Sequence, residues 1–445
     1  MSRITLATLG GLLLATAPAA AQLGSYNPRA GARETLVIRN AMIHPVTGPV
    51  IARGSLVVSD GRITAIGATV TEPTGARVID ANGLHVWPGM MDGATRMGLS
   101  EIPQGANATV DASEVGDYTA NAQAINGLNP HSAHIGVTRM AGITHVVSAP
   151  TGGTISGSAA LVHLGGDTPP EMSVVRNAAM VITLPRRGFG GRGGFGGFGG
   201  QAPGSTQDAD RARERQLDSL RAVLADARAY AAAHAAAKAD PSLPRPAEDL
   251  VLAALGPAVA GTMPVLFNAD RAGDIREAIT FAEAEKLKPI IIGGADAWQV
   301  ASLLKEKDVP VVLTGIMGLP SREDDPYDVN FSAPSVLAKA GVRFAISAGD
   351  DGAEVRNLPQ VAGMAAAFGL AKEDALKAVT LWPAQIFGVA DRLGSLEVGK
   401  MANVVVTDGD ILEARTRPVH LIIDGRVVPL GSKHEALYEM FKDRP

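Results

Sequence analysis

Eight short runs of apolar and β-branched residues alternate with alanine-rich stretches along the middle of the chain, and this alternation constrains the fold most. The runs lie at 85–92, 142–150, 159–164, 180–185, 263–270, 289–296, 309–315 and 342–350. Strands that alternate with helices form parallel βαβ units, and eight such units close into a barrel. Continuous apolar runs also fit strands buried on both faces. We therefore predict an α/β protein with a (β/α)8 TIM-like barrel over residues 87–392.

Two segments outside this region have a different texture. Residues 34–86 and 393–430 alternate apolar and polar residues over short stretches, with turn signals such as Asp424-Gly425. This pattern is typical of short antiparallel strands. The economical arrangement joins the N-terminal and C-terminal segments in one small β-sandwich domain beside the barrel. Within the barrel region, the stretches between runs predict helices at 207–238, 271–287, 297–307, 360–370 and 372–380.

The first 21 residues predict a secretory signal peptide. Arg3 precedes a short apolar run that ends in small residues at Ala19 and Ala21. The run is too short for a comfortable transmembrane helix, so we expect cleavage and a periplasmic or secreted protein without a transmembrane anchor. The chain has no cysteine, which excludes disulfides and thiol chemistry. Its net charge of -5 argues against a nucleic-acid partner.

A glycine-rich insertion occupies residues 186–204. Glycine at this density does not hold one backbone conformation. Two interpretations remain open for it: a mobile lid over the barrel, or a surface insertion that the fold tolerates.

Five stretches together resemble the amidohydrolase superfamily, in its imidazolonepropionase-like and prolidase-like branches. They are LVIRNAMIHPVTG, DANGLHVWPGMMD, RMAGITHVVSAPTGGTISG, PVLFNADRAGDI and ALKAVTLWPAQIFGVADRLGSLEVGKMANVVV. The resemblance runs over roughly residues 35 to 430. It implies a scaffold for metal-dependent hydrolysis of C–N bonds, in which zinc lowers the pKa of a bound water and an aspartate takes its proton.

The resemblance also implies a ligand set, and this chain departs from it. Two histidines are expected after the first strand, where Ala94 and Arg96 stand. Histidines are expected near the ends of the fifth and sixth strands, where Asn268, Asp270 and Gly293 stand. The aspartate of the eighth strand is kept as Asp350, with Asp351 as the rival for that role.

The other candidate ligands do not rebuild this set. A bridging lysine is ruled out on the fourth strand, because the first lysine of the chain is Lys238, in a helical stretch. His131 and His134 have a spacing that suits one helical face, which is a weak indication of a metal site. We therefore expect no metal and no other cofactor, although zinc is implied for active relatives.

The loss of a metal ion would leave the negative charge of Asp350 without a compensating cation. Without the ion, Asp350 would be a desolvated carboxylate without a cation, at a cost of several kcal/mol. We therefore predict that Arg96 takes the vacated space and pairs with Asp350, or else with Asp270.

The functional prediction is an exported protein on an amidohydrolase scaffold whose metal site has degenerated. Its role would be non-catalytic, binding a small-molecule ligand in the barrel mouth or pairing with an intact amidohydrolase relative. The alternative is an active hydrolase of C–N bonds other than peptide bonds, with Asp350 as general base. Whether any catalysis remains, and for which substrate, stays open at this point.

Overall fold

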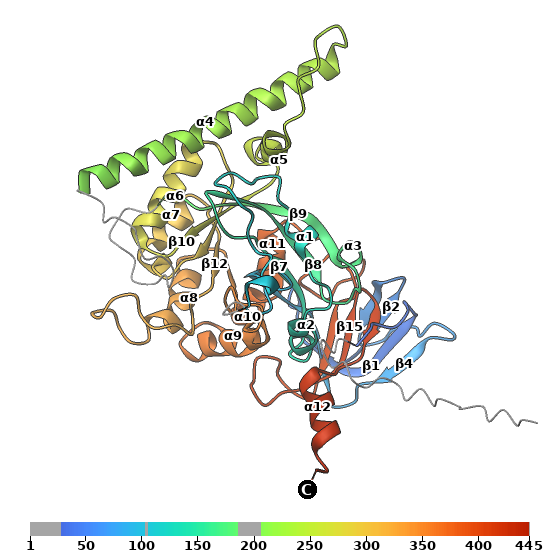
Figure 1. Ribbon diagram of the computed structural model, residues 1–445. Helices are drawn as coiled ribbons and strands as arrows, with labels where there is room; N and C mark the ends of the chain where they lie inside the picture. Colours follow the sequence, from blue (N-terminus) through green and yellow to red (C-terminus); the bar gives the residue numbers. More distant parts are fainter. Residues whose placement is uncertain (1–27, 103–105, 186–205, 445) are drawn as a thin grey trace, which may run out of the picture.

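The computed structural model consists of two eight-stranded sheets and the helices that pack on them. The structure describes residues 28–102, 106–185 and 206–444. The signal peptide predicted at 1–21 and the glycine-rich insertion predicted at 186–204 lie outside these ranges. Figure 1 shows the barrel strands in the centre and the second sheet beside them, where blue N-terminal strands meet red C-terminal ones.

The first sheet is a nearly closed barrel, as the sequence predicts. Its strands follow the chain order without interruption, from β6 at one end to β13 at the other. They are β6 (Met90–Thr95), β7 (Ile143–Ser148), β8 (Ile155–His163), β9 (Ser173–Ile182), β10 (Val265–Ala269), β11 (Pro289–Gly293), β12 (Val311–Leu313) and β13 (Phe344–Ile346). Each predicted run overlaps one of these strands, although β6, β8 and β9 extend beyond their runs.

One strand of the barrel runs against the others, which corrects the prediction of eight parallel strands. β8 pairs antiparallel with both β7 and β9, whereas the other neighbouring pairs are parallel. The reason is the length of the connection: only residues 149–154 separate β7 from β8. A parallel crossover needs about a dozen residues or more, while an antiparallel turn needs very few. Apolar content alone does not reveal strand direction.

The second sheet, which we call the composite sheet, joins the two ends of the chain. Its order is β16-β15-β14-β5-β1-β2-β3, with β4 paired to β1. The N-terminal segment provides β1 (Leu36–Ile43), β2 (Ile51–Ser59), β3 (Arg62–Gly67), β4 (Arg77–Asp80) and β5 (His85–Pro88). The C-terminal segment provides β14 (Val404–Thr407), β15 (Pro418–Ile423) and β16 (Arg426–Val428). The two segments meet where β5 pairs antiparallel with β14.

The run 85–92, predicted as a single strand, is divided between the two sheets. β5 ends at Pro88 in the composite sheet, and β6 begins at Met90 in the barrel. Gly89 lies at the break, where an added Cβ would overlap the side chain of Thr144. The chain can therefore pass from one sheet to the other only with a glycine at this point.

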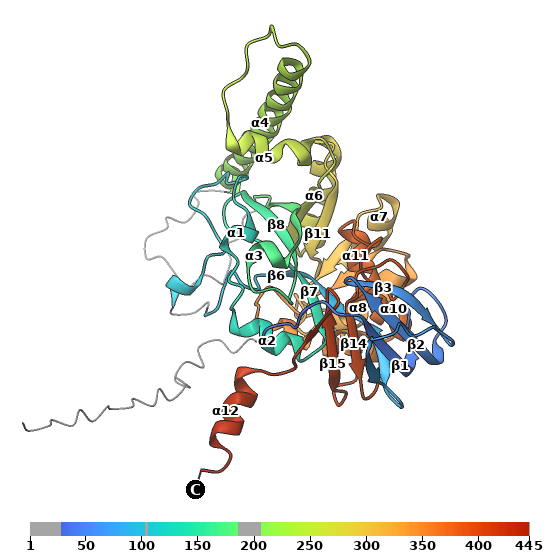
Figure 2. The same ribbon diagram turned by 90° about the vertical axis from the view of Figure 1, so that its right-hand side faces the viewer.

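Twelve α-helices are present in the described residues. They are α1 (Ala124–Gly127), α2 (Ala133–Arg139), α3 (Pro169–Met172), α4 (Thr206–Ala239), α5 (Leu250–Val259), α6 (Ala272–Ala284), α7 (Ala301–Glu306), α8 (Val329–Lys339), α9 (Leu358–Ala367), α10 (Lys372–Ala378), α11 (Leu381–Ile386) and α12 (Lys433–Phe441). The five predicted helices coincide with α4, α6, α7, α9 and α10. Figure 2 shows that α4 projects away from the barrel. No helix in the described ranges has the length and apolar character to span a bilayer.

Alternate residues of the barrel strands face two different apolar layers. Met91, Val147 and Val181 belong to the cluster inside the barrel. Their sequence neighbours Met90 and Val146 belong to the cluster between the strands and the helices. Because both faces are covered, the strands are apolar throughout, which is why they appear in the sequence as continuous runs.

Side chains and loop backbone close the barrel where its first and last strands meet. No strand ladder joins β6 to β13 in the described sheet. Instead, Asp92 Oδ2 accepts a hydrogen bond from Ala348 N at 2.9 Å, and Ser347 Oγ donates to Ala94 O at 2.8 Å. Arg96 N donates to Asp350 O at 2.7 Å. We call this set of contacts the seam.

Candidate functional site

One cavity at the carboxyl end of the barrel strands gathers the residues that the sequence indicates. It has a volume of about 350 Å³. All six predicted residues line it: Ala94, Arg96, Asn268, Asp270, Gly293 and Asp350. They meet because each lies at or just after the end of a barrel strand, and these ends share one face of the barrel. We call this space the mouth cavity.

Arg96 and Asp350 form an ion pair at the edge of the mouth cavity. Arg96 Nη2 lies 3.0 Å from Asp350 Oδ2, and Arg96 Nε lies 3.4 Å from the backbone oxygen of Asp350. The Arg96 side chain is 23 % exposed, but that of Asp350 is 74 % exposed. The carboxylate is therefore solvated, and the expectation of a desolvated Asp350 is wrong. The loop after β13 carries Asp350 outward, which the sequence does not reveal.

Asp351, the rival of Asp350, has a different role. Its Oδ1 accepts a hydrogen bond from Ala353 N at 3.0 Å, within its own turn. Asp350 lines the mouth cavity and Asp351 does not. Of the two carboxylates, the geometry puts Asp350 in the candidate site.

Asp270, which follows the end of β10, lies against Gly293 at the end of the neighbouring strand β11. Gly293 has a φ of 101°, which favours glycine, and a Cβ added there would overlap Asp270 Oδ1. The position at which a histidine was expected therefore has no room for an imidazole. Asn268 is engaged as well, because its Nδ2 donates to Thr183 Oγ1 at 3.0 Å.

Asp92, which the sequence reasoning missed, lies in the seam below the mouth cavity. Its side chain is fully buried, and its Oδ1 accepts from Ala94 N at 3.1 Å. Burial raises the pKa of Asp92 to about 6, and hydrogen bonds from Ser347, Ala348 and Ala94 offset part of that rise. A charged residue inside the apolar run WPGMMD was the available signal, because a buried carboxylate needs several donors.

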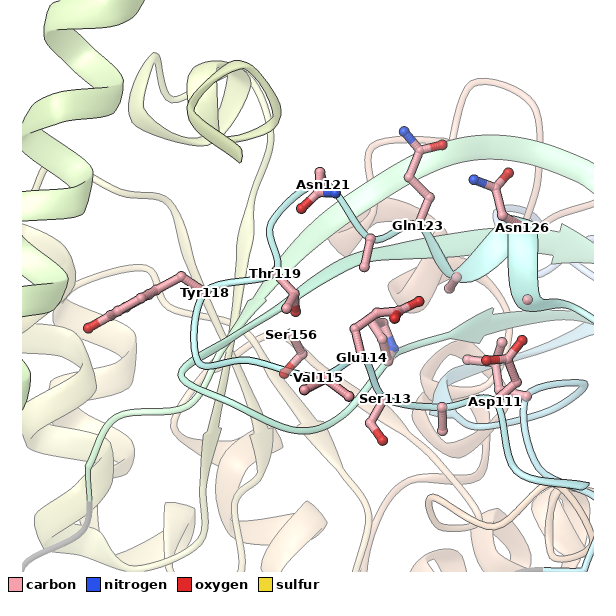
Figure 3. Close-up of a pocket in the computed structure, with 16 residues that line it drawn as sticks. Asp111, Ser113, Glu114, Val115, Tyr118, Thr119, Asn121, Gln123, Asn126 and Ser156 are labelled. Carbon is pink, nitrogen blue, oxygen red and sulfur yellow. The ribbon is translucent and has the colours of Figure 1, made fainter. Parts of the chain in front are cut away.

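A second cavity, of about 590 Å³, adjoins the first. Pro150 lines both. Figure 3 shows Asp111 and Glu114 on this cavity, together with Gln123 and Asn126. The oxygens of those two amides are held by Arg176, at 2.8 Å from Gln123 Oε1 and 2.6 Å from Asn126 Oδ1. The lining is thus polar and acidic.

The acidic loop after β12 is ordered by an arginine. Arg322 Nη1 lies 3.2 Å from Asp296 Oδ2, and Arg322 Nη2 lies 3.0 Å from Asp325 Oδ1. Asp296 is buried, and its backbone N donates to the backbone oxygen of Asp270, a residue of the mouth cavity, at 2.8 Å. The loop 321–328 therefore has an ion-pair network of its own at the carboxyl end of the barrel.

Histidines gather instead at the amino end of the barrel, near the composite sheet. His145 is fully buried, and its Nδ1 lies 2.8 Å from Thr144 Oγ1. Burial, with a smaller effect from the charge of His163, lowers the pKa of His145 to about 3. Neither His145 Nε2 nor Asn403 Nδ2 has a hydrogen-bonding partner within the described part of the chain, and both residues line one small cavity. We call this region the base.

The side chains of the mouth cavity do not fit the zinc ion that the fold implies. Zinc sites take imidazole nitrogens, thiolates and carboxylates in tight geometry. Here the strand-one positions are a methyl group and a guanidinium cation, and that cation lies 3.0 Å from the carboxylate of the eighth strand. Asp270 and Asn268 add only oxygen donors.

His131 and His134, the weak alternative, do not line this cavity. His134 Nε2 is 3.0 Å from the backbone oxygen of Glu101. Within the described residues no three His, Asp or Glu side chains gather as a metal-binding group.

Comparison with known proteins supports the fold over most of the chain. Residues 336–429 match the model of an amidohydrolase family. The crystal structure of an amidohydrolase from Thermotoga maritima MSB8 is similar, with a TM-score of 0.76 and 24 % identity, over 88 % of this chain and 99 % of that one. A prolidase complexed with N-methylphosphonate-L-proline has a TM-score of 0.52 and 18 % identity, over 88 % and 99 % of the two chains.

Two curated relatives are similar in sequence. Amidohydrolase tasK from Hapsidospora irregularis is 28 % identical over 436 residues, which are 89 % of this chain but 43 % of that protein. D-hydantoinase from Geobacillus stearothermophilus is 38 % identical over 86 residues, 19 % of this chain and 17 % of that protein. The chain thus spans less than half the length of either relative. Residues 336–429 thus match an amidohydrolase family model, and the solved structures share the fold of the chain over most of its length.

Proposed function

We propose that this chain is a non-catalytic member of the superfamily that binds a ligand at the barrel mouth without metal-dependent hydrolysis. One observation carries the proposal: Arg96 occupies a strand-one ligand position and pairs with Asp350 at 3.0 Å. A guanidinium has no lone pair to offer a metal and repels a divalent cation. The residue that active relatives use as a base is thus paired with a cation of the chain.

Two further positions support the proposal. Ala94 has no donor atom, and Gly293 has no space for a ligand side chain beside Asp270. Restoring one ligand would leave the others missing. The proposed loss of metal binding therefore depends on several positions, some of which lack a donor atom and one of which lacks room for a ligand side chain.

The alternative, an active hydrolase that uses Asp350 as general base, finds less support. A general base needs to reach its proton in a defined geometry, and water-excluding surroundings strengthen it. The Asp350 side chain is 74 % exposed and one of its oxygens contacts Arg96.

Export and partnership are further parts of the proposal. The signal-peptide pattern at 1–21 supports a periplasmic or secreted location. An intact amidohydrolase is the partner we propose, with a small molecule as the ligand.

Elemental analysis and hydrolysis assays of the same preparation test the proposal. Protein purified without chelator should carry well under one equivalent of zinc. Its rate of hydrolysis of amide or cyclic amide substrates should not exceed that of the Ala94→His/Arg96→His variant. This variant should also lack stoichiometric zinc, because positions 268 and 293 still have no imidazole. Stoichiometric zinc with hydrolysis that EDTA abolishes would contradict the proposal.

A further inference from the structure

The contact between Arg96 and Asp350 is held by one carboxylate oxygen. Arg96 Nη2 and Asp350 Oδ2 are 3.0 Å apart, and the side chain of Asp350 is 74 % exposed. Paired guanidinium and carboxylate groups are strongest when two parallel N–H···O bonds form. Asp350 therefore does not provide the two parallel hydrogen bonds that a guanidinium forms best with a carboxylate.

The Asp350 side chain can leave Arg96 while the backbone stays in place. Arg96 N donates to the backbone oxygen of Asp350 at 2.7 Å, and this bond belongs to the seam. Rotation of the Asp350 side chain does not break it. The carboxylate would move from one solvated position to another, so its release carries little desolvation cost.

We propose that the mouth cavity binds a small carboxylate-bearing molecule whose carboxylate displaces Asp350 from Arg96. This inference rests on the proposed non-catalytic binding role and names the class of ligand. The exchange replaces one carboxylate by another, so the charge facing the guanidinium is conserved. A free carboxylate can adopt the two-bond geometry, whereas Asp350 is limited by its own backbone.

The rest of the mouth cavity suits the body of such a molecule. Its volume of about 350 Å³ lies in the range of small-molecule sites. Ala94, Val181 and Ile292 provide apolar contacts, and Thr183 and Thr314 provide hydroxyls. Asp350 then acts as an internal competitor that keeps Arg96 paired when no ligand is present.

The test compares two probes that differ only in the group that Arg96 would recognise. N-acetylglycine carries a carboxylate, and N-acetylglycinamide carries a neutral carboxamide of the same shape. Binding is measured by NMR titration of the full-length mature protein at low ionic strength, because salt screens exposed charges. N-acetylglycine should bind, and the carboxamide should bind at least about tenfold more weakly.

Three variants separate the roles of the two residues. Asp350→Asn removes the competitor and should tighten N-acetylglycine binding by about two- to fivefold. Arg96→Gln should abolish the preference for the carboxylate, and Arg96→Lys should recover only part of it, since lysine lacks the fork. Asp351→Asn is the matched control, because Asp351 bonds within its own turn and does not line the cavity.

Several results would overturn the inference. They are equal binding of both probes, weaker binding by Asp350→Asn, or a carboxylate preference that survives in a folded Arg96→Gln protein. Absence of binding to both wild type and Asp350→Asn would overturn it too. The same NMR samples report the cleavage of N-acetylglycine to acetate and glycine. Cleavage with bound zinc would refute the proposed function, whereas failure of binding without cleavage would refute only the ligand class.

Discussion

The two ends of the barrel treat polar side chains in opposite ways. At the base, His145 is fully buried and one of its nitrogens lacks a partner in the described chain. At the mouth, Arg96 and Asp350 are paired, but Asp350 is 74 % exposed. Between them lies Asp92, which is buried and accepts hydrogen bonds from two backbone N–H groups. We therefore expect the pH dependence of stability to come mainly from the buried groups His145 and Asp92, and the solvated ion pair at the mouth to contribute little to stability.

The largest expected effect is at the base. The pKa of His145 is lowered to about 3, below the value of about 6.5 in the unfolded chain, so the unfolded state binds more protons as pH falls. Stability is then present above pH 6.5 and is lost toward pH 3, by about 3 kcal/mol between pH 8 and pH 4. His145→Gln should remove that part of the acid sensitivity in urea unfolding at the two pH values. The exposed His131→Gln is the control, and equal acid sensitivity in both variants would count against the prediction.

The seam should respond to pH with the opposite sign. The pKa of Asp92 is raised to about 6, so the folded state binds more protons than the unfolded chain between pH 4 and pH 6. Its contribution is largest below pH 4 and is lost as pH rises through 6. The free energy of unfolding of Asp92→Asn, minus that of wild type, should therefore increase by about 2 kcal/mol from pH 4 to pH 8. Asp351→Asn should show no such trend; a flat difference for Asp92→Asn would mean that its carboxylate titrates as in water.

Much of this architecture is predictable from the sequence, and the failures have identifiable physical reasons. Strand positions follow from apolar runs, because strands covered on both faces need apolar residues throughout. The direction of β8 does not follow from its composition, although the six residues 149–154 before it are too few for a crossover. The local sequence also does not indicate that residues 85–92 belong to two sheets. The break at Gly89 depends on its close contact with Thr144, which is distant in sequence.

The candidate site shows the same division. Its members could be named because strand ends in this fold converge on one face, and spacing identifies the strand ends. The exposure of Asp350 could not be foreseen, since it depends on how far the loop after β13 rises above the barrel. Asp92 was overlooked because two of its partners are backbone N–H groups, of β6 and of the loop after β13, and such groups carry no signature in the sequence.

A smaller effect is expected at Gly293, inside the mouth. Gly293→Ala introduces a Cβ at a φ of 101° and against Asp270 Oδ1, which should destabilise the fold by about 1–3 kcal/mol. Gly315→Ala is the control, because an added Cβ there meets nothing. Thermal and urea unfolding provide the measurement. Equal stability of the two variants would mean that Asp270 moves away without cost.

The smallest effect is expected at the ion pair. A double-mutant cycle of Arg96→Met and Asp350→Leu, followed by urea unfolding, should give a coupling energy below about 1 kcal/mol, because one partner is 74 % exposed. Raising the salt concentration should reduce it further. A coupling of about 3 kcal/mol or more would show that the pair is desolvated, and the contrast between mouth and base would disappear.

The composite sheet can finish folding only after the C-terminal segment has been synthesised. β5 pairs with β14 through Trp87 and Val405, so nearly the whole barrel lies between the two partners along the chain. Contacts this distant in sequence form slowly, since the loop must close before they stabilise anything. During synthesis β1 and β2 can pair early, but the edge of β5 stays open until residue 404 emerges from the ribosome. A chain interrupted before that point exposes an unpaired strand edge, which is a template for aggregation.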